Sequence, residues 1–278
     1  MSTGHEWLAV HHGQAPLIVS FPHTGTEIPP DIENQLVSPW LARKDADYWV
    51  DVLYDFARTL GATTVRTALS RTVIDVNRDP SGVSLYPGQT TTGLCPTETF
   101  DVEQLYKRGA EPDANEVARR TAAFHEPYHQ ALREQIARLR QSHTAVVLYD
   151  AHSIRSQVPR LFEGELPQFN IGTNDGAACS PDLTAAVEKI CDASRFSRVT
   201  NGRFRGGWIT RHHGQPDSGI HAIQMELSMR GYLHEPATRN EQSWPAPLDE
   251  ELAAVLRLPL AGVLRTCIRF AANAGAAT

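Results

Sequence analysis

The sequence predicts an α/β protein with a mixed, mostly parallel sheet and helices on both faces. Short runs of apolar, strand-forming residues alternate with longer segments of helical periodicity along the chain. Several of these runs are almost continuously apolar, which is typical of strands that are covered on both faces. We expect strands at residues 16–21, 63–69, 72–76, 145–152, 169–173 and 220–227, and helices at about 38–60, 116–140, 182–193 and 250–274.

The composition is that of an ordinary globular protein. The 278 residues are 41% hydrophobic and 21% charged, and we expect one domain over residues 1–278 because α/β folds of this size are commonly a single unit. A formal net charge of −6 and the lack of a local basic patch argue against nucleic-acid binding. No apolar run in the sequence reaches the roughly 18 residues that cross a bilayer, so we expect no membrane association.

Cysteine usage and the first residues bear on location. The four cysteines are widely spaced and form no CxxC pair, which fits a reducing compartment. Residues 1–12 contain no basic segment followed by an apolar one, as an export signal would. We therefore expect a cytoplasmic protein, and the sequence carries no prediction of its oligomeric state.

Two histidines stand at the carboxyl ends of predicted strands, where α/β sheets bind their ligands. His23 follows the strand at 16–21, and His152 ends the strand at 145–152. A lone histidine in such a place is more often structural, but a second one at the end of another strand could share one ion with it. Asp150 lies two residues before His152 on the same side of an extended chain, where it could orient that imidazole.

A catalytic zinc ion needs a third protein ligand. Asp47 and Asp51 lie one turn apart on the predicted helix at 38–60. We expect Asp47, nearer the core edge of that helix, to be the ligand, and Asp51 is the alternative. Both aspartates could instead be solvated helix charges.

Glu226 lies within the apolar run at 220–227, where an unpaired carboxylate would be costly to bury. Beside a metal ion and a water molecule it would act as a general base. The structural alternative is a buried salt bridge to Arg230, one turn away if a helix begins there. Asn174, after the strand at 169–173, is expected at the same edge of the sheet.

Cationic and amide side chains surround the same presumed cleft. Arg71, Asn77 and Arg78 come just before and within a stretch rich in glycine and proline at 77–96, and Arg211 opens a polar turn at 211–214. Arginine forks suit carboxylates, so these four residues predict binding of a small acidic substrate. Each arginine alone is more often a surface charge. A loop of ~20 residues inside a compact domain is more often functional than idle.

Other catalytic mechanisms lack their usual signals. The sequence contains no GxSxG, no P-loop and no GxGxxG. Ser153, beside His152, is only a weak candidate for a nucleophile.

Four segments together resemble the N-formylglutamate amidohydrolase (deformylase) family. They are SFPHTG (residues 20–25), SRTVIDVNR (70–78), LYDAHS (148–153) and HAIQMELS (221–228), and the likeness runs in order from about residue 16 to residue 233. The resemblance implies a zinc carboxypeptidase-like (phosphorylase/hydrolase-like) fold, with His23 and His152 as metal ligands and Glu226 as the carboxylate that activates water. The broader zinc carboxypeptidase pattern has a glutamate three residues after its first histidine, where this chain has Thr26.

The resemblance predicts hydrolysis of N-formyl-L-glutamate to formate and L-glutamate, as in histidine degradation, with one divalent ion, zinc, as cofactor. Two alternatives stay open. The same metal enzyme could act on another N-acyl amino acid or a peptidoglycan-type amide, and the same scaffold could be a non-catalytic protein that binds an acidic small molecule.

Overall fold

The computed structural model describes residues 6–274 and contains a seven-stranded sheet of order β1-β3-β2-β4-β7-β5-β6. The four central strands β3, β2, β4 and β7 run parallel to one another, whereas β1 runs antiparallel to β3 and β5 runs antiparallel to β7. The predicted fold class, a mixed and mostly parallel sheet between helices, is confirmed. The strands are β1 (Leu8–His11), β2 (Leu17–Phe21), β3 (Thr63–Thr67), β4 (Val146–Ile154), β5 (Phe169–Gly172), β6 (Arg198–Thr200) and β7 (Ile220–Ser228).

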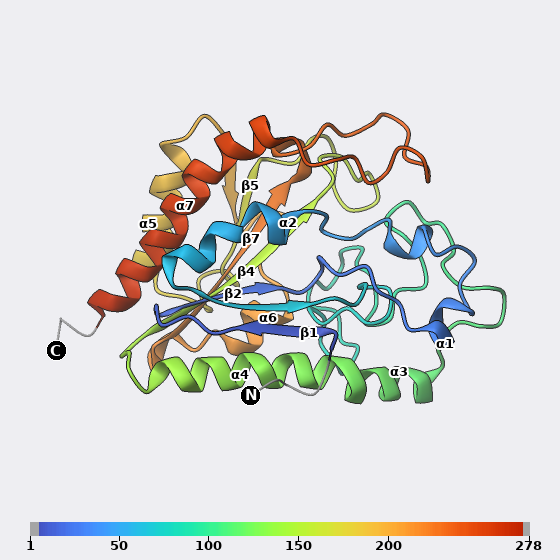
Figure 1. The fold of residues 1–278 in the computed structure, drawn as a ribbon, viewed down its shortest axis with the longest axis horizontal. Helices are drawn as coiled ribbons and strands as arrows, with labels where there is room; N and C mark the ends of the chain where they lie inside the picture. The colour runs from blue at the N-terminus through green and yellow to red at the C-terminus, as the bar shows by residue number, and fades with distance from the viewer. Residues whose placement is uncertain (1–5, 275–278) are drawn as a thin grey trace.

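Helices cover both faces of the sheet (Figure 1). One face packs against α2 (Val50–Leu53), α5 (Pro181–Asp192) and α7 (Glu250–Asn273), and the other against α4 (Glu126–Arg140) and α6 (Trp208–His213). The short helix α1 (Pro30–Glu33) lies among the loops, and α3 (Ala114–Arg120) leads into α4 through a π-helical turn at Thr121–His125.

The helices α5 and α7, which lie on the same face of the sheet, start where their sequences supply caps. The Ser180 hydroxyl accepts a hydrogen bond from the backbone of Asp182 at the start of α5, and Pro181 occupies the first helical position. At the start of α7 the Asp249 carboxylate accepts hydrogen bonds from two backbone N–H groups of the first turn. The apolar faces that follow these caps complete the hydrophobic core on this side of the sheet.

The alternation of side chains along β4 and β7 positions the polar residues of the sheet. Val147 and Tyr149 point toward α5 and α7, so the residues between them point toward α4 and α6. In the parallel register of these strands His152 lies opposite Glu226, and Asp150 lies opposite Gln224. Four polar side chains therefore share one face at the carboxyl ends of neighbouring strands.

The segment 38–60 is not the single helix that its periodicity predicts. It contains a 3-10 turn at Leu41–Arg43, the short helix α2 and a 3-10 segment at Asp55–Leu60. Trp49 has a left-handed backbone with φ of 67°, which a continuous right-handed helix does not allow. Its indole N–H donates to the carbonyl of Ala246, so a contact with a segment distant in sequence outweighs the local helical pattern.

Two other sequence predictions need correction. Residues 72–76 form a turn rather than a strand, because the hydroxyls of Ser70 and Thr72 both donate to the carbonyl of Ala42 and fold the chain. Residues 211–213 are the last turn of α6 and not a loop. The strands β1 and β6 were not predicted, since edge strands of three or four residues carry too short an alternation to detect.

Asn174 does not reach the edge of the sheet that holds His152 and Glu226. Strand β5 is antiparallel to β7, with Gly172 opposite Gln224 and Phe169 opposite Leu227. The carboxyl end of β5 therefore points toward the amino end of β7. The expectation for Asn174 was wrong because strand direction is not readable from an isolated apolar run.

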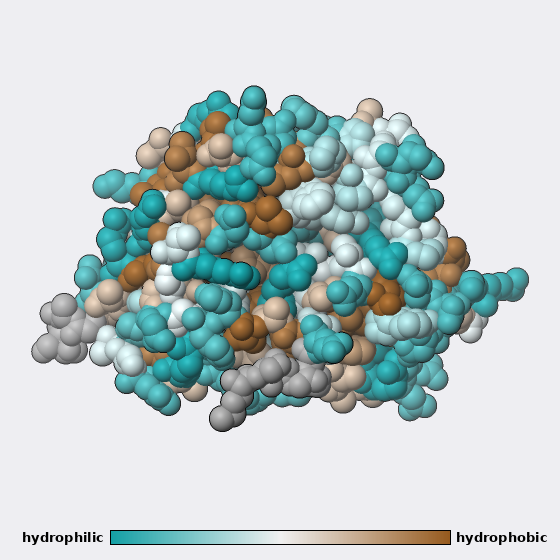
Figure 2. All heavy atoms as spheres, in the orientation of Figure 1, coloured by the Kyte–Doolittle hydropathy of each residue, from teal (hydrophilic) through white to brown (hydrophobic). Residues whose placement is uncertain are grey.

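The surface in Figure 2 is mostly polar, and its hydrophobic side chains are scattered among hydrophilic ones. The large exposed hydrophobic residues of the described chain are few and lie far apart in sequence: Val37, Val52, Val83, Val102 and Leu258. Within residues 6–274 no helix combines the length and apolarity needed to cross a membrane.

A cluster of histidines joins α4 and α6 to the segment that follows β3. The Nε2 atom of His129 lies 2.8 Å from the carbonyl oxygen of Val76, and its Nδ1 atom lies 2.9 Å from Nε2 of His213. Neutral rings satisfy both contacts when each Nε2 carries the proton and His129 accepts at Nδ1. Burial lowers the pKa of His129 well below its ordinary value of 6.5 and lowers the pKa of His213 to about 3.

Acid should therefore destabilise the fold through this cluster. A histidine whose folded pKa is depressed contributes its stability above the unfolded value near 6.5 and loses it as pH falls, by at most about 1.4 kcal/mol per pH unit. Urea unfolding between pH 7.5 and 5.5 should show a shallower pH dependence for His213→Gln, which keeps a donor, than for the unsubstituted protein. His11→Gln, at an exposed side chain at the end of β1, should leave it unchanged. Equal slopes for all three proteins would contradict this assignment.

Candidate active site

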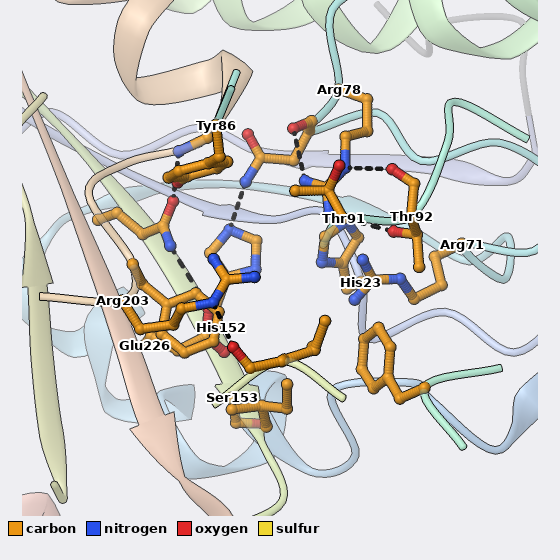
Figure 3. Close-up of a pocket in the computed structure, with 17 residues that line it drawn as sticks. His23, Arg71, Arg78, Tyr86, Thr91, Thr92, His152, Ser153, Arg203 and Glu226 are labelled. Atoms are coloured by element: carbon orange, nitrogen blue, oxygen red, sulfur yellow. Dashed lines mark hydrogen bonds between the residues drawn. The ribbon is translucent and has the colours of Figure 1, made fainter. Parts of the chain in front are cut away.

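Three buried side chains from distant parts of the sequence converge on one point (Figure 3 labels the two histidines). His23, Asp47 and His152 each offer a ligand atom, and these atoms all lie within 4.8 Å of one another. The Oδ2 atom of Asp47 is 3.7 Å from Nδ1 of His23 and 3.1 Å from Nδ1 of His152. The two imidazole rings, predicted to meet, have centroids 4.8 Å apart. We call this set the His–Asp–His group.

Each imidazole is oriented by a second carboxylate. Nε2 of His23 lies 2.7 Å from Oδ1 of Asp75, and Nε2 of His152 lies 2.9 Å from Oδ2 of Asp150. In the tautomer with the proton on Nε2, each ring donates to its carboxylate, and the Nδ1 atom on the Asp47 side is left free to bind an ion. The position of Asp150 agrees with the sequence prediction. Asp75 was missed, although an acidic residue inside the apolar sequence VIDV carries the same signal as Glu226.

Backbone contacts hold Asp47 in place. Its N–H donates to the carbonyl of His23, and its Oδ2 atom accepts from the N–H of Ser153 at 3.1 Å. Asp51, the alternative ligand, instead forms an ion pair with Arg66 at 2.7 Å and does not join the group. Asp47 therefore reaches the site from the turn before α2 rather than from a helix flank.

Without an ion, the electrostatics of the group favour a protonated His152 beside an ionised Asp47, and a bound cation would take the place of that proton. Burial alone would raise the pKa of Asp47, but hydrogen bonds from His152 and His23 outweigh burial and hold that pKa below its ordinary value. Burial would likewise lower the pKa of His152, whereas the carboxylates of Asp150 and Asp47 raise it well above 6.5. Each group thus depends on its neighbours for its charge.

Glu226 lies beside the His–Asp–His group, and no cationic side chain of the described residues forms an ion pair with it. Its carboxylate accepts a long hydrogen bond of 3.4 Å from Gln224. Burial raises the pKa of Glu226 to about 8, and the negative charge of Asp47 adds to this, while His152 acts in the opposite direction. The alternative salt bridge to Arg230 is absent, because that guanidinium pairs with Glu165 at 3.3 Å.

A cavity of about 550 Å³, counted with its open mouth, lies in front of these residues. Arg71, Asn77 and Arg78 line it as the sequence predicts. Arg211 does not, since its Nε donates to the carbonyl of Gly206 and its guanidinium stacks over Tyr86. The loop rich in glycine and proline contributes lining residues that the sequence did not single out, namely Tyr86, Thr91 and Thr92, and Arg203 enters from the segment after β6.

Asn77 is engaged mainly by protein groups. Its Nδ2 atom lies 3.2 Å from Oδ2 of Asp150 and 2.9 Å from Nε2 of His152, and its Oδ1 atom accepts from the backbone of Ile209. Asn77 therefore has a second role beside the predicted contact with substrate, which is to position His152. Arg71 pairs with Asp75 at 2.6 Å and lies 3.8 Å from Asp47, beside the His–Asp–His group.

The His–Asp–His group fits a divalent ion. Ligands held about 2.0–2.1 Å from a tetrahedral ion are spaced roughly 3.3 Å apart, and the two distances to Asp47 bracket that value. The donor set of two imidazoles and one carboxylate is one that zinc accepts while it keeps a position open. Oδ1 of Asp150 is buried and has no hydrogen-bond partner within residues 6–274, which leaves an unsatisfied acceptor close to the group.

The mostly parallel α/β sheet carries two imidazoles, a shared carboxylate and a separate glutamate at one edge, an arrangement typical of hydrolytic enzymes of the α/β class. The sequence model of the N-formylglutamate amidohydrolase family matches residues 15–233. The chain belongs to this family, and the predicted resemblance is confirmed. That the whole of residues 1–278 is a single such domain stays a prediction.

Relatives and solved structures agree with this assignment. The chain is 44% identical over 260 residues to an N-formylglutamate deformylase of Pseudomonas aeruginosa, covering 93% of this chain and 96% of the relative. It is 41% identical over 267 residues to an N-formylglutamate deformylase of Pseudomonas putida, covering 96% and 97%. The crystal structure of N-formylglutamate amidohydrolase from Ralstonia eutropha is similar with a TM-score of 0.74 at 25% identity, covering 96% of this chain and 98% of that one.

Replacement of Asp47 tests the composition of the His–Asp–His group. Asp47→Asn removes the anionic ligand but keeps its size, so the affinity for Zn²⁺ measured by competition with a chromogenic chelator should fall more than about a hundredfold. The matched variant Asp51→Asn should change it less than about threefold, because Asp51 pairs with Arg66 instead. Equal losses in the two variants would remove Asp47 from the ligand set.

Proposed function

We propose that this chain hydrolyses N-formyl-L-glutamate to formate and L-glutamate, as a step of histidine degradation. The observation that carries the proposal is the convergence of His23, Asp47 and His152 beside Glu226, in a chain of this family. The names of its relatives from two Pseudomonas species support the same substrate. The four free cysteines, all buried, support a cytoplasmic location.

His23, Asp47 and His152 would hold one divalent ion, and we propose zinc. When bound, the ion would supply a Lewis acid that polarises the formyl oxygen and favours deprotonation of the attacking water. Asp75 and Asp150 would keep both imidazoles in the tautomer that offers Nδ1 to the ion.

Glu226 acts as general base in the proposed reaction. Its carboxylate removes a proton from water as the oxygen attacks the formyl carbon, and it returns that proton to the glutamate nitrogen as the C–N bond breaks. Burial keeps the carboxylate a stronger base than an exposed glutamate, since its pKa is raised to about 8. A positive charge in the His–Asp–His group would lower that pKa and favour the ionised form at neutral pH.

Arginines give the cavity its preference for anions. Arg71 and Arg78 line it, and Arg71 lies next to the His–Asp–His group. We propose that Arg71 and Arg78 bind substrate carboxylate and fix the orientation of the formyl group. The predicted contact between Arg211 and substrate stays a proposal, and it requires that guanidinium to leave its place over Tyr86.

Metal removal should abolish the reaction. Dialysis against a chelator is expected to remove about one ion per chain and to stop formate release from N-formyl-L-glutamate, and Zn²⁺ should restore the rate. Elemental analysis and a formate assay measure the two quantities on the same sample. Circular dichroism of the metal-free protein serves as the control for folding. A metal-free sample with its full rate would exclude the proposed role of the ion.

Glu226→Gln separates catalysis from binding. The amide keeps the shape of the side chain but cannot take a proton, so kcat should fall by roughly 10³-fold. Calorimetric affinity for N-formyl-L-glutamate should stay within about threefold of the unsubstituted enzyme, because the group acts mainly in the transition state. The control Glu134→Gln changes an exposed helix residue and should keep full activity. Unchanged kcat in Glu226→Gln would assign the base to another residue, and a protein that binds the substrate without turnover before substitution would be a binding protein.

A further inference from the structure

Three arginines line the cavity, and they differ in how their charge is balanced. Arg71 pairs with Asp75 at 2.6 Å, and Arg78 lies 3.8 Å from the same carboxylate. No carboxylate of the described residues lies within ion-pair distance of Arg203. Arg203 is therefore the cavity arginine whose positive charge is left for a ligand.

The guanidinium of Arg203 is held in place by neutral groups. Its Nε donates to the carbonyl of Leu161 and its Nη2 donates to the carbonyl of Thr90, both at 2.6 Å. Its carbon lies 5.7 Å from the ring centre of Tyr86 and 5.5 Å from that of Phe204. These contacts fix the plane of the group but leave Nη1 without a hydrogen bond to the described residues.

The surroundings of Arg203 make the unbalanced charge costly. Burial lowers the pKa of its guanidinium, and the positive charge of Arg78 lowers it further, with only partial compensation from Tyr86 and Glu226. An anion placed against Nη1 would relieve this cost. Its hydrogen bond would also be of the charge-assisted kind, which is stronger than one between neutral groups.

Arg71 and Arg203 lie on opposite sides of the cavity (Figure 3). Every N-acyl amino acid carries an α-carboxylate next to the amide that is cut, and Arg71 is placed beside the His–Asp–His group, 3.8 Å from Asp47. The feature peculiar to an acidic substrate is a second carboxylate, which lies farther from the amide. Arg203 is fixed by two loops, through Thr90 and Leu161, and suits this second group.

We propose that Arg203 binds the side-chain carboxylate of the substrate and thereby selects an acidic amino acid over its neutral amide. The inference rests on the proposed function and adds to it the residue that recognises the side chain of the substrate. It also implies that substrate binding strengthens the link between the loops at 77–96 and 155–168, because one guanidinium contacts both loops and the ligand.

The test compares kcat/KM for N-formyl-L-glutamate and N-formyl-L-glutamine in matched variants. Arg203→Met should lower kcat/KM for the glutamate substrate by roughly a hundredfold and change that for the glutamine substrate less than about threefold. For Arg203→Lys, kcat/KM for the glutamate substrate should lie between the values of the unsubstituted enzyme and Arg203→Met. Lysine keeps the positive charge but cannot form the two parallel hydrogen bonds of a guanidinium. Arg205→Met is the control, because Arg205 pairs with Asp175 at the surface with 44% of its side chain exposed.

The ratio of the two kcat/KM values is the deciding quantity, because any loss of folded enzyme lowers both equally. A ratio in Arg203→Met equal to that of the unsubstituted enzyme would overturn the assignment of Arg203. An equal loss on both substrates in a variant that circular dichroism shows to be folded is the same result, and it would point to the α-carboxylate or to loop structure. If the unsubstituted enzyme fails to cut N-formyl-L-glutamate at all, the proposed function fails first, independently of Arg203.

Discussion

The sharing of one buried carboxylate by two imidazoles is the interaction around which the site is organised. Asp47 contacts Nδ1 of both His23 and His152, and this arrangement works only because each opposite nitrogen is held by its own carboxylate. The site as a whole buries more negative than positive charge. Arg71 is the only buried guanidinium among the described lining residues, whereas four buried carboxyl groups lie in or beside the cavity: Asp47, Asp75, Asp150 and Glu226. Without an ion, protonation of His152 and Glu226 reduces this excess, since the pKa values of both groups are raised, and a divalent cation would replace those protons.

Such a site requires a rigid frame, and the frame comes from the sheet. His152 and Glu226 are fixed opposite each other by a nine-residue parallel register between β4 and β7. The opposite faces of these strands carry the apolar side chains that pack under α5 and α7. Because alternate residues on one strand serve the core and the site, a shift of the register by one residue would bury the site residues in the core and expose the core to the cavity. The positions of His152 and Glu226 therefore depend on the same pairing of β4 with β7 that builds the core.

The parts of this design that depend on short stretches of sequence were predictable. Apolar runs indicated the central strands, and polar residues within them or at their ends indicated His23, His152 and Glu226 from the sequence alone. Contacts between distant segments were not predictable. Trp49 takes a left-handed conformation, tied by its indole to Ala246, and this contact rather than helical spacing delivers Asp47. Asp47 was thus named correctly from the sequence but placed on a helix, whereas it lies in the turn before α2.

The same distinction explains why the sequence analysis named Arg211 and missed Arg203. Both residues are arginines in polar segments, and nothing within a few residues of either tells which guanidinium faces the cavity. The choice is made by Tyr86, which donates to the carbonyl of Gly206, 120 residues away in sequence, and stacks with Arg211 on its ring. Arg203 meets the same ring but extends toward the loop carbonyls of Thr90 and Leu161.

Strands and loops thus divide the work of the site. The groups proposed to act on the amide lie at strand ends or in turns held by main-chain hydrogen bonds, where their positions are shared with the core. Arg203 is held by the loop carbonyls of Thr90 and Leu161, and loops tolerate substitution far better than strands do. A change of the side chain that the enzyme accepts would then require changes in these loops alone, while the His–Asp–His group and Glu226 stay as they are. Recognition of the substrate side chain can therefore change through loop substitutions that leave the core of the protein intact.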